Sequence, residues 1–284
     1  MFGLTIPELY TTYVGGSGNE RLPQQRLLKH VFNSGGDGQG GVLYGDDFRN
    51  FAQVTVTGIT GGYYGYIEVD ATVGSVKQNA SDKYGSINLL TSTDAADGAN
   101  HDTVLIGGGN TGSYILLDGT KKTVFDVGFR LSTAVTDGLR SVFCGLIQEG
   151  TAAANGVIND SSGHIMADKN VIGWNVLEGD GDSLGLTYKA DGQTVQRPTG
   201  LLTTAAAATW YRRGFVLDPL APASKRISVY HDNVEQGTYV TETQLEAATF
   251  PDDDYLALAM AIKADDDAAA QDFDVGYIYV WQEL

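Results

Sequence analysis

Apolar and polar residues alternate with a period of two in many segments of this chain. Residues 272–284 show it most clearly, because large aromatic and branched side chains fall on every second position from Phe273 to Trp281. The segment 123–132 repeats the pattern, with Phe125 and Phe129 on one side and polar residues or glycine between the apolar positions. A period of two that carries aromatic and β-branched residues is typical of a strand with one buried face.

The alternation predicts an all-β fold, a sandwich of antiparallel strands. Helical segments do not alternate with the strands, so the crossovers of a parallel sheet are not expected. One short helix is expected over residues 242–248, with Thr241 or Thr243 as its cap. The expected strands cover residues 63–70, 84–91, 103–106, 113–117, 123–132, 141–148, 171–177, 183–189, 210–218, 226–232, 255–263 and 273–282.

Glycine has an unusual place in three of these strands. The chain has 37 glycines and only 6 prolines, which suits many turns and bent strands. Gly128, Gly214 and Gly276 each stand in mid-strand directly before an aromatic residue. An interior glycine usually marks a bend, a bulge or a close backbone approach, so we expect curved sheets here rather than an open ligand groove.

The first 45 residues differ in kind from the rest and predict an N-terminal arm. Residues 22–32 could form one helix between glycine-rich hinges, which would need to dock on another surface to be stable. A disordered leader is the alternative. The domain prediction is therefore an arm over 1–45 and a sandwich body over 46–284.

The charge narrows the range of partners. The net charge is −17, while residues 1–45 hold three basic and three acidic side chains, so the deficit belongs to the body. An acidic body repels phosphate backbones, which argues against nucleic acid. The sequence has no apolar run long enough to span a membrane. Its N-terminus also lacks the features of a secretory signal, so synthesis in a cytoplasm is expected.

The candidate chemistry is sparse, and the sequence predicts no enzyme, no cofactor and no metal. Cys144, the single cysteine, lies in an apolar run and is expected to be a buried, inert thiol. The acidic runs at 180–182, 252–254 and 265–267 are read as solvated charge, with a structural calcium site as the alternative. Glu68 and Asp70 are the only pair of acids two apart inside an expected strand, and no third acid completes a glycosidase pattern.

Two groups of residues are candidates for contact with a partner. Tyr63, Tyr64 and Tyr66 follow a glycine pair, and Tyr64 and Tyr66 share a strand face with acids. Tyrosines of this kind can bind either a glycan or a protein neighbour. In the arm, the expected contact residues are Arg21, Arg26, Leu27, Leu28 and Phe32.

The order of the strand segments resembles that of a known family. The chain is similar to the concanavalin A-like (LamG-like) jelly rolls of tailed-phage structural proteins, especially capsid decoration or cement proteins, over about residues 46–284. The calcium-binding loops of legume lectins are not recognisable. The segments that carry the resemblance are 46–48, 123–131, 143–146, 210–218, 227–232 and 273–280.

The resemblance implies a virion protein on the outer surface of the capsid. Such a protein binds the major capsid protein, stabilises contacts between its subunits and is often a homotrimer. Two alternatives stay open: a fibre or adhesin-type virion protein that binds host glycans, and a glycan-cleaving jelly-roll enzyme.

Overall fold

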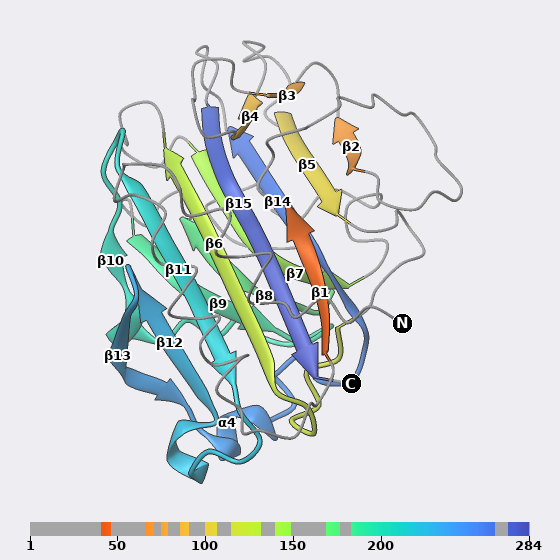
Figure 1. Cartoon of the computed structure of the whole chain (residues 1–284), viewed down its shortest axis with the longest axis vertical. Helices are drawn as coiled ribbons and strands as arrows, with labels where there is room; N and C mark the ends of the chain where they lie inside the picture. The colour runs from red at the N-terminus through yellow and green to blue at the C-terminus, as the bar shows by residue number, and fades with distance from the viewer. Residues whose placement is uncertain are drawn as a thin grey trace, which may run out of the picture.

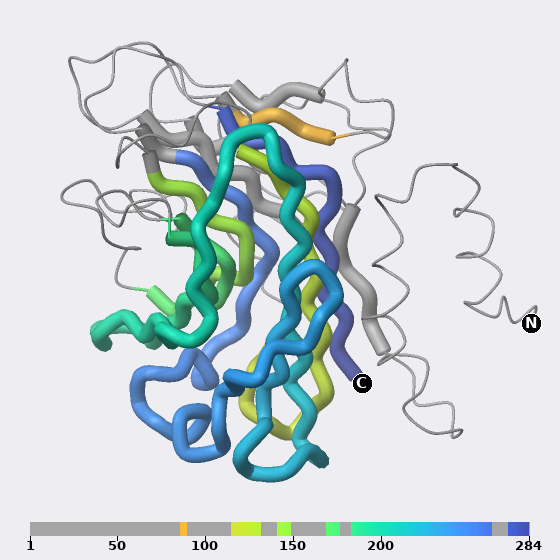
Figure 2. Tube along the Cα trace, turned by 90° about the vertical axis from the view of Figure 1, so that its left-hand side faces the viewer, coloured from red at the N-terminus to blue at the C-terminus, as the bar shows by residue number. Residues whose placement is uncertain are grey.

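A computed structural model describes residues 41–46, 66–70, 75–78, 86–90, 100–106, 115–131, 140–148, 169–176, 183–264 and 272–283. These residues form two antiparallel sheets that stack as a sandwich (Figures 1 and 2). The fold is an all-β jelly-roll sandwich, so the fold class expected from the alternation is confirmed. Among the described residues, no helix is long and apolar enough to cross a membrane.

Sheet A has eight strands among the described residues, and β15 lies at its centre. β15 pairs with β6 along one side, and on the other side β4 and β1 pair with its first and second halves. In order across the sheet the strands are β13 (Val234–Val240), β12 (Ile227–His231), β11 (Trp210–Leu217), β6 (Thr123–Leu131), β15 (Asp272–Glu283), β4 (Ile87–Leu90) and β3 (Ser75–Gln78), with β1 (Gly41–Asp46) beside β15.

In the part of the chain that the structure describes, sheet B has seven strands, and β14 and β7 form its centre. From β6 onward the chain crosses between the two sheets after β6, after β10, after β13 and after β14. In order across the sheet the strands are β10 (Thr203–Thr204), β9 (Ser183–Lys189), β8 (Val171–Val176), β7 (Arg140–Gln148), β14 (Leu256–Ala264), β5 (Asn100–Ile106) and β2 (Tyr66–Asp70).

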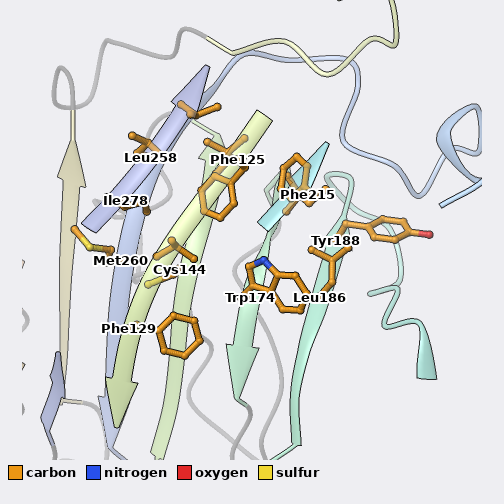
Figure 3. Packing of buried hydrophobic residues seen from close by; sticks show 14 of the residues in the cluster. Phe125, Phe129, Cys144, Trp174, Leu186, Tyr188, Phe215, Leu258, Met260 and Ile278 are labelled. Carbon is orange, nitrogen blue, oxygen red and sulfur yellow. The ribbon is translucent and has the colours of Figure 1, made fainter. Parts of the chain in front are cut away.

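The core lies between the two sheets, and the strands whose side chains the structure describes fill it from alternate positions (Figure 3). Phe125 and Phe129 of β6 face it, and the Phe125 ring stacks on that of Phe215 with 5.2 Å between centroids. From sheet B, Trp174 and Met260 enter the same core. A core of this size needs no disulfide, and Cys144 is a free, buried thiol within it, as expected.

Most of the expected strands occur with small shifts at their ends, and the differences have a physical reason. The segment 113–117 contributes only an isolated bridge from Ile115 to Leu256 among its described residues. The edge strand β13 was not expected, because its sequence, VEQGTYV, lacks a regular apolar face. An edge strand with exposed positions does not need the alternation that burial imposes.

The short helix was expected and is present as α4 (Glu242–Leu245), preceded by Thr241. The Thr241 hydroxyl accepts a hydrogen bond from the backbone N–H of Gln244, and the Gln244 side chain accepts one from the Thr241 N–H at 2.9 Å. This reciprocal pair is a capping box and explains where the helix begins. Two 3₁₀ turns, η3 (Thr199–Leu201) and η4 (Ala223–Lys225), complete the described helical elements.

Candidate functional site

The richest group of polar and aromatic side chains lies on the outer face of sheet A, the face turned away from the core. It is formed by the strand positions that alternate with the core residues. We call it the outer face, and its described members are Asn88, Val124, Asp126, Gly128, Arg130, Trp210, Arg212, Gly214, Val216, Ser228, Tyr230, Asp274, Tyr277, Tyr279 and Trp281.

One end of the outer face carries a fixed arginine. The Arg130 Nε and Nη2 atoms lie 2.9 and 2.7 Å from Asp274 Oδ2. Asn88 Nδ2 donates to the other oxygen, Asp274 Oδ1, at 2.9 Å. The Asp274 side chain is 1% exposed and that of Arg130 is 27% exposed, so a buried carboxylate holds a guanidinium at the surface. The Arg130 Cζ atom also lies 5.0 Å from the centre of the Trp210 ring.

Two glycines make room for rings on this face. A Cβ atom on Gly128 would overlap the Tyr277 ring, and one on Gly276 would lie 3.1 Å from Trp210. Strand β15 has a register shift between Val275 and Tyr277, which makes Gly276 the extra residue of a bulge. The expected irregularity is therefore present at Gly276, and the glycines also seat aromatic rings.

Asp126 occupies the centre of the outer face, opposite Gly214 on β11 and Tyr279 on β15. Its side chain is buried, Oδ1 accepts a hydrogen bond from the Tyr277 hydroxyl at 3.3 Å, and Oδ2 has no partner in the described structure. Burial raises the pKa of Asp126 to about 7, against the opposing effects of the Tyr277 hydroxyl and the Arg212 charge. This carboxyl therefore changes its charge near neutral pH.

A second polar group lies between the sheets, where β11 and β12 face β8. Arg213 donates to Asp232 Oδ2 at 3.0 Å and to Thr203 Oγ1 at 3.3 Å, and its Cζ atom lies 5.9 Å from the centre of the Trp174 ring. The His231 ring meets Trp174 edge-on at 5.2 Å. Burial, assisted by the Arg213 charge, lowers the pKa of His231 to about 4. These contacts fasten the β12–β13 turn to both sheets, which indicates a structural role.

The residues expected to contact a partner lie mostly outside the described residues. Tyr66 is the first residue of β2 and pairs with Ile106, at the edge of sheet B. In the same strand, Glu68 pairs with Val104 and Asp70 with Asp102. The acidic runs 180–182 and 265–267 lie outside the described residues. So do the remaining contact candidates, which are Arg21, Arg26, Leu27, Leu28, Phe32, Tyr63 and Tyr64.

The described acidic run, Asp252 to Asp254, binds side-chain amides. Asn170 Nδ2 donates to Asp253 Oδ1 at 2.7 Å, and Gln148 Nε2 donates to Asp254 Oδ2. Burial raises the pKa of Asp252. In the part of the chain that the structure describes, no three His, Cys, Asp or Glu side chains are grouped so as to hold a metal ion.

Asp126 and Asp274 are the two buried acids of the outer face. Asp274 pairs with Arg130, which is four residues from Asp126 on β6, so they lie roughly 13 Å apart at about 3.3 Å per residue. Glycosidase carboxyl pairs are about 5–9.5 Å apart, so these two do not form one.

The sequence missed the group formed by Arg130, Trp210 and Asp274. Alternation alone puts each residue on the polar side of its strand. Only the order β11–β6–β15 brings the three strands together. An ion pair between residues on neighbouring strands can be predicted from a sequence only when the pairing of the strands is known.

Comparisons with known proteins bear on the fold. No family model and no curated protein matches the sequence. Among solved structures, an endo-1,3-beta-glucanase from Streptomyces sioyaensis is 12% identical, with a TM-score of 0.52, and the match covers 88% of this chain and 99% of that one. An endo-beta-1,4-glucuronan lyase from Trichoderma reesei is 13% identical, with a TM-score of 0.48, over 74% of this chain and 87% of that one. The carbohydrate recognition domain of Emp47p is 10% identical, with a TM-score of 0.49, over 88% and 100%.

The likeness to the Streptomyces glucanase, with a TM-score above 0.5, supports the concanavalin A-like jelly-roll fold. It also corrects one expectation. The sequence predicted that the chain is not an enzyme. That prediction is wrong, because the same fold forms a glucanase in the Streptomyces protein. The chain therefore has the concanavalin A-like jelly-roll fold.

Proposed function

We propose that this chain is a structural protein of a tailed phage that binds the outside of the capsid and stabilises contacts between major capsid subunits. The proposal is carried by the order of the strand segments that resemble capsid decoration proteins. Segments 123–131, 210–218, 227–232 and 273–280 correspond to β6, β11, β12 and β15, four strands that adjoin one another in sheet A. In the same proposal, the chain is made in the host cytoplasm, forms a homotrimer and is finally located on the capsid surface.

The position of β1 supports a role for the preceding residues in attachment. β1 pairs with β15 from Gly41–Glu283 to Asp46–Ile278, beside the C-terminal end of the chain (Figure 1). Residues 1–40 are joined to the body at Gly41, the first residue of β1. A segment anchored in this way can reach a neighbouring subunit while the body remains rigid.

The test is removal of residues 1–40, with the cut placed before Gly41 so that β1 is kept. Phage heads that lack this protein are incubated with the full chain or the truncated chain, and occupancy is measured by electron cryomicroscopy. We expect the truncated chain to leave the heads bare while it keeps the circular dichroism spectrum and melting temperature of the full chain.

A full-length variant with Leu27→Ser and Leu28→Ser serves as the matched control for an effect of chain length. It is expected to lose occupancy as the truncated chain does. Full occupancy by the truncated chain would show that the arm has no part in attachment. A full chain that fails to decorate the heads would refute the capsid proposal itself.

Carbohydrate recognition is the second candidate function, and the outer face favours it. Trp210, Arg130 and Tyr279 are half-exposed on one face of a sheet, in a fold shared with a glucanase. Aromatic rings beside a few fixed polar groups are typical of small-ligand sites. Binding of the full chain to a glycan array tests this candidate, and incubation with any bound polysaccharide tests for cleavage.

A further inference from the structure

We propose that Arg130 and Trp210, with Asp274 as a positioning residue, form a subsite for a neutral hexose unit at the β4 end of the outer face. The inference deepens the second candidate function and rests on it. It depends on how the guanidinium is held, which donors it has left, what charge the group carries and which surface lies beside it.

The guanidinium is held in place before any ligand arrives. Asp274 is almost completely buried and uses Oδ2 for two contacts with Arg130, while Asn88 binds Oδ1. The Trp210 ring packs beside the guanidinium at 5.0 Å and rests against Gly276. Fixed donors lose little conformational entropy on binding, so such an arrangement favours recognition.

Arg130 keeps donors that bind no group among the described residues. A guanidinium carries five N–H bonds in a planar fork. Contacts with Asp274 occupy Nε and Nη2, and Nη1 donates to no atom of the described residues. With 27% of the side chain exposed, these N–H groups can reach the hydroxyl oxygens of a bound molecule.

The charge of the group favours a neutral ligand. The Arg130 cation is matched by the Asp274 anion at 2.7 Å, so the pair has no net charge to offer an anion. The whole chain carries −17, which repels anionic ligands at longer range. A neutral ligand is not repelled in this way, and its hydroxyl groups can still accept hydrogen bonds from Arg130.

Trp210 supplies the apolar part of the subsite. Its side chain is half-exposed, and the bulge at Gly276 lets the ring lie against the sheet. A hexose presents hydroxyl oxygens together with C–H groups, and the pair of Arg130 and Trp210 matches both. A peptide carboxylate would match only Arg130.

The test begins with the full chain on an array of neutral gluco-, manno- and galacto-oligosaccharides and of sialylated and uronic-acid glycans. The affinity for the best neutral glycan is then measured for Trp210→Ala, Arg130→Ala, Arg130→Lys and Lys225→Ala. Lys225 of η4 is the matched control, because its Nζ lies 4.4 Å from the ring centre of Tyr239 on β13, which makes a second cation–aromatic pair. Melting temperatures of all variants identify any that fail to fold.

We expect neutral glycans to bind, Trp210→Ala and Arg130→Ala to weaken binding about tenfold or more, and Lys225→Ala to leave it unchanged. Arg130→Lys keeps the charge but loses the fork, so it should also weaken binding. Glycan binding that survives both alanine substitutions would overturn the subsite but leave carbohydrate recognition standing. Binding of anionic glycans alone would overturn the neutral ligand, and binding of no glycan would overturn the second candidate function together with this subsite.

Discussion

At the residue scale, the buried carboxyl of Asp126 is the most unusual group on the outer face. It lies in the middle of a sheet between Gly214 and Tyr279 and accepts a hydrogen bond from the Tyr277 hydroxyl. Its pKa of about 7 in the folded chain exceeds the value of 3.8 that an ordinary aspartate has, because burial disfavours the charged form. A raised pKa stabilises the fold at low pH, and this contribution is lost as the pH rises through 7.

Asp126→Asn should remove this pH dependence. A difference of about three between the two pKa values corresponds to roughly 4 kcal/mol between pH 4 and pH 8. In urea titrations from pH 4 to pH 8, the free energy of unfolding of the natural chain should fall between about pH 4 and pH 7 and level off above pH 7. The variant should lose most of that fall. Asp191→Asn, at an exposed carboxyl, is the control, and an unaltered slope in the Asp126 variant would contradict the buried position.

At the element scale, the bulge in β15 and the glycine opposite it shape the outer face. The sequence predicted an irregularity wherever a glycine precedes an aromatic residue in mid-strand, and at Gly276 this is confirmed. It did not reveal that Gly128 accommodates the ring of Tyr277, because the two residues are far apart in the chain and meet only through the β6–β15 pairing. β13 was missed for the opposite reason, since an exposed edge imposes no pattern.

Gly128→Ala should destabilise the sheet by about 1–3 kcal/mol, because the new methyl group overlaps the Tyr277 ring and forces it to move. The matched control is Gly237→Ala on β13, where a Cβ atom would meet nothing within 4 Å. Thermal or urea unfolding compares the two. Equal effects at both positions would mean that loss of glycine, rather than the ring contact, determines the change.

At the scale of the whole molecule, β15 is the strand of sheet A that pairs with three other strands. β6 pairs with it on one side, while the short strands β4 and β1 share the other side from opposite ends. β1 comes from the beginning of the sequence and β4 from a separate segment. The long C-terminal strand is therefore completed by distant parts of the chain.

Removal of residues 1–46 should be far more damaging than removal of residues 1–40. The longer deletion takes away β1 and leaves the second half of β15 with an unpaired edge, which favours aggregation. Size-exclusion chromatography and melting temperature compare the two truncated chains. If the chain without β1 remains as soluble and as stable as the other, then β1 does not contribute to the body in the way its register indicates.

The sequence by itself determined the fold class, the alternate positions that fill the core, the burial of Cys144 and the presence of a short helix from residue 242, with Thr241 or Thr243 as its cap. All of these follow from local periodicity or from contacts within a few residues. Tertiary structure decided which strands are neighbours. It thereby brought Arg130, Trp210 and Asp274 together, buried Asp126 beside Tyr277 and placed β1 against β15. Such contacts join residues that are distant in the chain, and an alternating pattern specifies the face of a strand but not its partner.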